Sequence, residues 1–333
     1  MIKIIATINK NPYNSKTTED VMKAGANYLR FNLSHNDPWF NVKLMEDAQA
    51  LTKKYGNCKI IADIPASKTR LSPFYKEISQ GQRIYVEEGK DYEFVASDKN
   101  DEDKNKIAIN TNDLSKILTV NNIVTIGDGD TAFLITNKNS DKSFTGKCLR
   151  STKFSYMTGV HTEKTAKLNS KLPDNIDDIL ESLRKFQPDM ICQSFVNSSQ
   201  DVIDFRSRLK NFGLDKIPLI AKIETKDGVD NVFDIAKQAD GLMVARGDLA
   251  LSTDFAKLDF YQKRIIQACR KNKKFSIVST QIIESILSKY VPQRSDITDL
   301  TNIILEKADA IMLCRETAHT NNPGENLSLI KSI

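Results

Sequence analysis

The stretch from residue 217 to 248 constrains the fold more than any other part of the chain. Residues 217–223 form a short, nearly continuous apolar run, which is typical of a parallel strand buried on both faces. Residues 228–239 then carry apolar side chains at helical spacing, and residues 241–245 form a second apolar run. Strand, helix and strand in this order predict a parallel sheet that is covered by helices.

Ionisable residues follow both strands of this stretch. Lys222 and Glu224 lie two positions apart, so their side chains project to the same side, and Asp248 follows the second strand. Two acids in this arrangement are placed to share a divalent cation, and oxygen ligands suit magnesium or manganese. A neighbouring lysine suits a phosphate or a developing enolate oxygen. The alternative is a surface salt bridge between Lys222 and Glu224, although buried strands seldom end in three ionisable groups.

The same alternation of strands and helices recurs on both sides of a break. Apolar strands are predicted at 3–8, 27–33, 58–63, 189–195, 217–223, 241–245, 275–280 and 310–314. Between about 71 and 158 the segments are instead short, strand-like and separated by Gly, Asn and Asp turns. The pattern predicts a (β/α)8 TIM barrel formed by residues 1–70 and 159–333, with an inserted all-β domain at 71–158 after the third strand.

Polar or charged residues stand at the predicted strand ends. They are Thr7, Arg30 with Asn32, Asp63, Ser194, Lys222 with Glu224, Arg246 with Asp248, Thr280 and Glu316. In a TIM barrel these ends form one rim, which carries the chemistry. Capping and loop solvation explain two or three of these residues but explain the whole set poorly, so the pattern predicts a catalytic rim.

Composition excludes several classes of protein. The net charge of +5 is dispersed along the 333 residues, which argues against nucleic-acid binding. The five cysteines are odd in number and far apart, which argues against a disulfide framework, and the three histidines lack zinc-ligand spacing. Neither a signal peptide nor a long apolar run is present. We therefore expect a cytoplasmic protein that binds neither nucleic acid nor membranes.

Several segments around the strand ends resemble those of pyruvate kinases. They are KIIATI, AGANYLRFNLSH, AKIETKDGVDN, ADGLMVARGDL, STQIIES, RSDITDLTN and ETA, in the order and spacing of that family. The resemblance covers residues 1–70 and about 170–333, and the inserted domain matches by position and length more than by sequence. It implies the glycolytic transfer of a phosphoryl group from phosphoenolpyruvate to ADP with magnesium or manganese, giving pyruvate and ATP.

The resemblance also implies roles for individual residues. It implies Lys222, Arg30 and Thr280 as catalytic residues; Arg30, Arg70, Lys222, Gly247, Asp248 and Thr280 as substrate-binding residues; Glu224 and Asp248 as magnesium ligands; and Asn32, Ser34 and Asp63 as a monovalent cation site. Lys222 would neutralise charge on the phosphoryl group and on the enolate that it leaves. Thr280 would belong to the path that delivers a proton to the enolate carbon, and the inserted domain would act as a lid.

The chain departs from the family pattern at several positions. Lys68 stands where the family usually has a glutamate, and its ammonium group is expected to replace the monovalent cation and make potassium dispensable. Ala250 and Arg315 replace two glycines near the rim, and little of the family's nucleotide-side motif survives between Thr158 and Glu163. These changes bear on ADP binding, because loss of backbone room at a glycine can block the approach of a phosphate. Because the sequence ends with the barrel, we expect no C-terminal regulatory domain, and a monomer or dimer in place of the usual tetramer.

Three functions are consistent with this sequence. The first is an active pyruvate kinase. The second is a weakly active or non-catalytic paralogue that binds phosphoenolpyruvate, pyruvate or another phosphate compound as a regulatory protein. The third is another enolate-forming enzyme on the same metal site, because a magnesium ion beside a cationic side chain stabilises any enolate of pyruvate.

Overall fold

The computed structural model describes residues 2–8, 15–34, 36–56, 58–73, 83–100, 103–155, 158–289 and 291–333. The chain divides into two compact units, and each is described here by itself. Unit 1 comprises residues 1–66 and 172–333, and unit 2 comprises residues 67–171.

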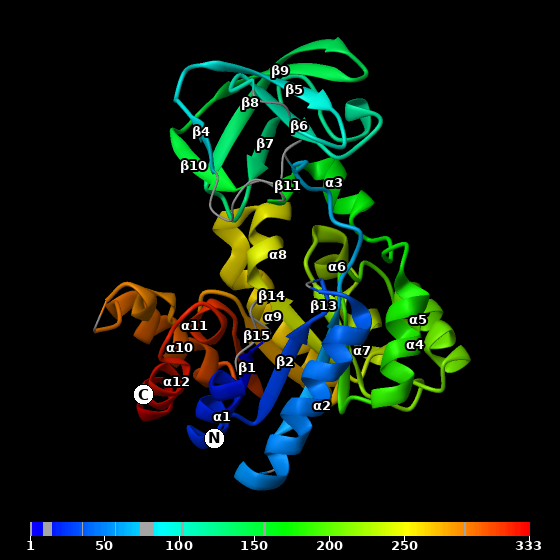
Figure 1. Cartoon of the computed structure of the whole chain (residues 1–333), viewed down its shortest axis with the longest axis vertical. Coiled ribbons are helices and arrows are strands. Elements are labelled where there is room, and N and C mark those ends of the chain that lie inside the picture. The colour runs from blue at the N-terminus through cyan, green and yellow to red at the C-terminus, as the bar shows by residue number, and fades with distance from the viewer. Residues whose placement is uncertain are drawn as a thin grey trace. The chain divides into compact units, whose positions relative to one another are not determined.

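Unit 1 is a closed barrel of parallel strands (Figure 1). Its strands are β1 (Lys3–Thr7), β2 (Tyr28–Asn32), β3 (Lys59–Ile64), β12 (Met190–Gln193), β13 (Leu219–Ile223), β14 (Gly241–Ala245), β15 (Phe275–Ser279) and β16 (Ala310–Leu313). Each strand pairs with the barrel strands before and after it in the chain, and β16 closes the barrel onto β1. All eight C-terminal ends therefore meet at one rim, which confirms the predicted TIM barrel.

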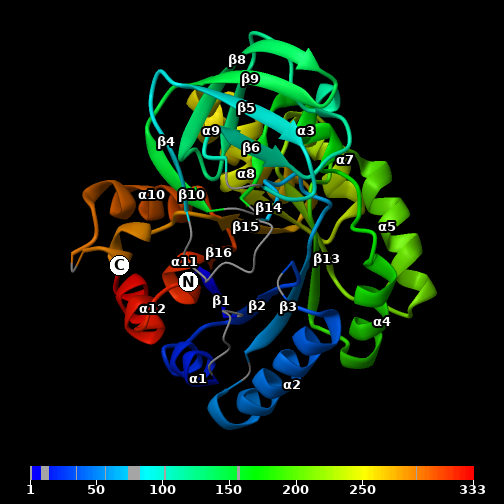
Figure 2. The ribbon, with the colours of Figure 1, turned by 45° about the horizontal axis from the view of Figure 1, so that its top comes forward.

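Helices surround these strands, and neighbouring helices pack side by side, for example α2 with α4 and α7 with α9 (Figure 2). They are α1 (Ser15–Lys23), α2 (Pro38–Tyr55), α4 (Ile176–Phe186), α5 (Ser199–Asn211), α6 (Lys226–Asp230), α7 (Val232–Gln238), α8 (Arg246–Ser252), α9 (Leu258–Asn272), α10 (Arg294–Leu305), α11 (Arg315–Ala318) and α12 (Pro323–Ser332). Local chemistry sets several helix starts. Asp37 accepts hydrogen bonds from the backbone of Trp39 and Phe40 before α2, and Ser198 forms a capping box with Asp201 in α5.

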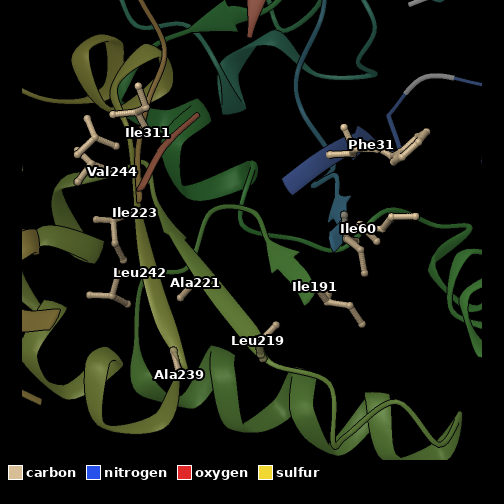
Figure 3. Close-up of a cluster of buried hydrophobic side chains, with 14 of the residues drawn as sticks. Phe31, Ile60, Ile191, Leu219, Ala221, Ile223, Ala239, Leu242, Val244 and Ile311 are labelled. Carbon is tan, nitrogen blue, oxygen red and sulfur yellow. The ribbon is translucent and has the colours of Figure 1, made fainter. Parts of the chain in front are cut away.

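Alternate residues of the barrel strands face opposite sides. One set packs against the helices and includes Phe31, Ile60, Leu219, Leu242 and Ile311 (Figure 3). The other set fills the barrel interior with the apolar side chains of Ile5, Tyr28, Ile61, Met190, Cys192, Ile220, Met243, Ile277, Ala310 and Met312. We call these interior residues the apolar plug. A residue two positions further along the same strand points to the same side and therefore lies between the plug and the C-terminal rim.

Unit 2 consists mainly of β-strands, and its apolar core is separate from that of unit 1. A six-stranded sheet has the order β11-β7-β8-β9-β5-β6, and a two-stranded sheet pairs β10 with β4. Its elements are β4 (Arg83–Val86), β5 (Asp91–Ala96), β6 (Lys106–Ile109), β7 (Ile123–Ile126), β8 (Thr131–Ser140), β9 (Ser143–Cys148), β10 (Thr152–Ser155), β11 (Val160–His161) and the short α3 (Glu163–Leu168). An inserted β domain follows β3, as the sequence predicts.

Some element predictions differ from the structure. The single helix predicted at 228–239 is two helices, α6 and α7, which meet at Asn231. Between β15 and α10, Glu284–Leu287 forms a 3₁₀ turn. Within unit 2, β9 and β10 are short and partly polar strands that give only a weak signal in the sequence. Among the described residues, no helix has both the length and the apolar content needed to cross a membrane.

Candidate active site at the barrel rim

A layer of polar side chains follows the apolar plug toward the C-terminal ends of the strands. Arg30, Asp63, Lys222 and Cys314 each lie two residues beyond a plug residue on the same strand or just after it. The barrel order brings them together, because β2 and β3 are neighbours, only β12 separates β3 from β13, and only β1 separates β2 from β16. The sequence predicted Arg30, Asp63 and Lys222 at the rim but not Cys314, and the strand pairing decides which of them meet.

Arg30 and Asp63 form a buried ion pair across β2 and β3. Arg30 Nε and NH2 donate to Asp63 Oδ2 at 2.9 and 2.7 Å, and NH1 donates to Thr7 Oγ1 at 3.2 Å. The side chains are 11% and 1% exposed, so water screens their charges little. Burial by itself would raise the pKa of Asp63, but Lys222 and Arg30 outweigh it and hold that pKa below its usual value.

Lys222 lies between two carboxylates. Its Nζ is 3.3 Å from Asp63 Oδ1 and 3.4 Å from Glu224 Oε1, and it donates to Ser194 Oγ at 2.9 Å. Burial alone would lower the pKa of Lys222, but Asp63 and Glu224 raise it above its ordinary value. The ammonium group is thus permanently charged at neutral pH, and it connects β3 to β13.

Glu224 is held by backbone groups from neighbouring loops. It is 2% exposed, and its Oε2 accepts the Phe195 N–H at 2.6 Å. Ser252 also donates to the Glu224 backbone carbonyl. Burial raises the pKa of Glu224, Lys222 lowers it, and the negative charge of Asp248 raises it further. The charges of Glu224 and Asp248 therefore interact with each other.

Asp248 and Gly247 lie in the first turn of α8, directly after β14. A Cβ on Gly247 would come 3.2 Å from Thr280 Cγ2, so the α8 turn and the end of β15 pack closely here. The structure thus brings together Lys222, Glu224, Gly247, Asp248 and Thr280 through contacts or charge interactions within unit 1.

Two residues of the predicted monovalent cation site, Asn32 and Ser34, contact each other at the end of β2. Ser34 donates to Asn32 Oδ1 through its backbone N–H at 3.2 Å and its hydroxyl at 2.9 Å. Asn32 and Asp63 are register partners across β2 and β3. The carboxylate of Asp63, however, faces the cationic groups of Arg30 and Lys222.

Lys68 and Arg70 belong to unit 2 and are described with that unit. The Lys68 side chain packs closely against Gly159. A Cβ atom added to Gly159 would come 2.9 Å from Lys68 Cε. Arg70 bridges Gly159 through its backbone, and its carbonyl accepts the Asn110 N–H at 3.1 Å. In the segment between Thr158 and Glu163, Thr162 caps α3.

The two other departures from the family pattern lie in unit 1. Ala250 lies inside α8. Arg315 is 57% exposed and pairs with Glu284 at 2.6 Å.

The donor set at the rim suits a magnesium ion. No group of three or more His, Cys, Asp or Glu side chains within the described part of the chain is arranged to hold a metal. Magnesium is commonly held by only one or two carboxylates, with substrate oxygens and water completing its octahedron. Glu224 and Asp248 supply two hard oxygen donors, and the charge of Asp248 acts to raise the pKa of Glu224.

The sequence analysis did not predict two contacts of this site. Ser194 accepts from Lys222 and donates to the Ile64 carbonyl at 2.8 Å, so it connects the lysine to β3. Phe195 directs its N–H at Glu224 from a left-handed backbone conformation with φ of 53°. Ser194 was recognisable as a polar strand-end residue, whereas the Phe195 backbone gives no signal in the sequence.

The fold and this rim define a (β/α)8 barrel with a buried, charged site at its C-terminal end. The pyruvate kinase barrel-domain family model matches residues 1–327, and the chain belongs to the pyruvate kinase family. A pyruvate kinase of Thermococcus litoralis is 28% identical over 99% of this chain and 68% of its own length. Those of Kluyveromyces lactis and Thermoplasma acidophilum are 29% and 28% identical over 96% and 99% of this chain. The chain spans 64% and 57% of the lengths of these last two relatives.

Proposed function

We propose that this chain transfers the phosphoryl group of phosphoenolpyruvate to ADP, giving pyruvate and ATP. The observation that carries the proposal is the continuous chain of buried charges Arg30, Asp63, Lys222 and Glu224. Burying four charges costs desolvation energy, so stability alone gives little reason for a protein to keep such a set. Groups with perturbed pKa values cluster at functional sites. Family membership supplies the reaction for which such a set is suited.

In this proposal Arg30 and Lys222 bind the phosphoryl group. Asp63 holds both cations in place, so their positions are fixed before the substrate arrives. Lys222 then neutralises the oxygens of the transferring group and of the enolate as charge develops on them. Because its pKa is raised, Lys222 acts as a fixed positive charge and does not serve as the proton donor.

Glu224 and Asp248 hold the divalent cation, with Gly247 allowing close approach at the same turn. Such a cation would supply positive charge that stabilises the phosphoryl and enolate oxygens. Thr280 faces the same turn and takes part in delivering a proton to the enolate carbon. Arg70 is assigned to phosphate binding from the family resemblance alone.

The monovalent cation is dispensable in this proposal. Lys68 supplies an ammonium group at the position where the family usually has a glutamate. Asp63 already has two cationic partners, so its charge is compensated without potassium. Assays in sodium or Tris salts are thus expected to give the same rate as assays in potassium, and a large potassium stimulation would contradict this part of the proposal.

The test is ATP formation from phosphoenolpyruvate and ADP with magnesium. The Lys222→Met variant is expected to lose turnover, while Lys216→Met, which removes a 93% exposed lysine just before β13, is expected to keep it. Equal loss in both variants, or equal turnover in all three proteins, would refute the assigned site. A folded protein that binds phosphoenolpyruvate without turnover would instead be a binding protein.

The remaining alternative is another enolate-forming enzyme on the same site. Magnesium-dependent exchange of the methyl protons of pyruvate, measured by NMR in deuterium oxide, distinguishes it from a pyruvate kinase. Exchange without phosphoryl transfer would indicate an enolate-forming enzyme that has lost ADP as its acceptor. Exchange together with transfer is the result that we expect, because the same cationic groups stabilise the enolate in both directions.

A further inference from the structure

Two consecutive residues at the end of β15 have a left-handed backbone. Thr280 has φ of 76° and Gln281 has φ of 52°. This conformation is unusual for any residue with a side chain, and for a β-branched residue such as threonine it is an outlier. Strained residues of this kind persist only where the surroundings hold them, and they cluster at functional sites.

The guanidinium group of Arg246 holds this strained turn. Its Nε and NH2 donate to the Thr280 carbonyl at 3.0 and 2.7 Å, and NH2 also donates to the Gln281 carbonyl at 2.8 Å. The planar fork of an arginine is suited to such a two-carbonyl contact, which a lysine cannot reproduce. Arg246 is 11% exposed, so little water is available to replace these bonds.

A second anchor fixes the guanidinium group from the other side. Arg246 NH1 lies 2.8 Å from both Oδ1 and Oδ2 of Asp299, which comes from α10. A further contact of 3.4 Å joins NH1 to Gln262 Oε1 on α9. The side chain is therefore held by elements that have no other part in the site.

The backbone of Arg246 belongs to the proposed metal-binding turn. It begins α8, and Gly247 and Asp248 follow directly. Gly247 packs against the Thr280 side chain. One residue thus connects the turn that carries Asp248 with the turn that carries Thr280.

We propose that Arg246 is a positioning residue that fixes the Thr280 hydroxyl relative to the metal-binding turn. The proposal rests on the proposed function, since it assigns Arg246 to the step in which Thr280 acts. Arg246 itself does not contact the reacting atoms in this account. Its removal therefore affects the proton-transfer step more than the binding of phosphoenolpyruvate.

The kinetic test compares Arg246→Ala with Arg208→Ala. Arg208 forms an exposed pair with Asp177 at 2.8 Å on the same barrel and serves as the matched control. Arg246→Ala is expected to lower kcat, and the rate of pyruvate methyl exchange, by about 100-fold, with KM for phosphoenolpyruvate changed far less. A kcat within about twofold of wild type would overturn the proposal.

A double-mutant cycle tests whether Arg246 acts through Thr280. In a Thr280→Val background, Arg246→Ala is expected to cost little further exchange rate, because the group that it positions is already gone. Fully additive effects would overturn the proposal. Absence of turnover and of exchange in the wild type would instead refute the proposed function.

Amide hydrogen exchange, read by mass spectrometry on peptides covering residues 280–283, tests the clamp without any activity. The Ile282 N–H donates to buried Glu316 at 3.1 Å, so it should exchange slowly in the wild type. Arg246→Ala is expected to speed this exchange at least about tenfold, whereas Arg208→Ala leaves it unchanged. If Arg246→Ala does not fold, Asp299→Asn removes the second anchor and should show smaller effects of the same sign. Unchanged exchange and unchanged kcat in Asp299→Asn would then overturn the proposal.

Discussion

The barrel rim of unit 1 and the surface of unit 2 hold charged pairs in different environments. In unit 1, Arg30 and Asp63 are 11% and 1% exposed and share their surroundings with Lys222 and Glu224. In unit 2, the pair formed by Lys138 and Asp141 has a similar separation of 2.7 Å, but its side chains are 44% and 73% exposed. The distance between the two charged groups of an ion pair therefore says little about the function of that pair.

Burial makes the difference. An exposed pair gains little energy, because water solvates both charges whether or not they meet. A buried pair must offset the cost of desolvation, and a well-packed apolar pair of the same volume is often at least as stable. The charges of the barrel rim are therefore better explained by binding and catalysis than by stability, whereas those on unit 2 are accounted for by solvation.

Removal of unit 2 should have the largest effect on activity. The Ser67 N–H donates to the Lys171 carbonyl at 2.8 Å, so the two ends of the unit are adjacent and a short Gly-Ser linker can replace residues 67–171. Because each unit has its own core, the shortened barrel is expected to fold and unfold cooperatively in urea. Turnover should be lost, because this deletion removes Arg70, which is assigned to phosphate binding. A shortened chain with wild-type turnover would show that the barrel alone is the enzyme.

The Asp63→Asn substitution should strongly destabilise unit 1. It leaves Arg30 and Lys222 without the carboxylate that both contact, and breaking a buried pair typically costs about 3–5 kcal/mol of unfolding free energy. Urea denaturation followed by circular dichroism would measure this loss. A loss close to zero would mean that water reaches the buried cluster.

The effect of Asp63→Asn should depend on pH. The pKa of Asp63 is lowered in the folded protein, so its stabilisation is present above the unfolded aspartate value and is lost as the pH falls through the lower folded value. The difference in unfolding free energy between wild type and variant should therefore be constant near neutral pH and narrow below about pH 4. A difference that widens on acidification would contradict the lowered pKa.

Metal binding should respond to Glu224 more modestly. Titration with manganese, followed by electron paramagnetic resonance of the free ion, is expected to show binding weakened at least about tenfold in Glu224→Gln. Glu181→Gln removes an acid that forms an exposed pair with Arg184 on α4 and should leave the affinity unchanged. Equal affinity in all three proteins would place the cation elsewhere.

The smallest effect is expected for Asp141→Asn in unit 2. Its partner Lys138 is exposed, and the contact is screened by salt. The urea midpoint of the variant should match that of the wild type within error. A clear loss of stability would mean that exposed pairs support unit 2 more than their exposure suggests, and would remove the contrast with the barrel.

Much of the fold was predictable because it depends on local pattern. Apolar strands such as 217–223 and 241–245 alternate with helices along unit 1, and this alternation identifies a parallel barrel before any contact is known. Boundaries were less predictable. Asn231 divides the predicted helix at 228–239 into two helices, and the spacing of the apolar residues does not indicate that break.

The candidate site was predictable in its residue types and not in its contacts. Lys222 and Glu224 had to share a side of one strand, since side chains alternate along it. Which groups they contact depends on strand register and on loops far away in the chain. Ser194 meets Lys222, and the Phe195 backbone meets Glu224, only because β12 pairs with β13.

The sequence by itself determined that this chain forms a barrel with cationic and acidic groups at the ends of its strands. Periodicity and side-chain alternation are local properties, and they suffice for that conclusion. Only the tertiary structure decided that Asp63 lies between Arg30 and Lys222, and that Arg246 reaches the strained turn at Thr280. Those contacts join residues more than 30 positions apart, so they arise from barrel closure and packing and leave no local trace in the sequence.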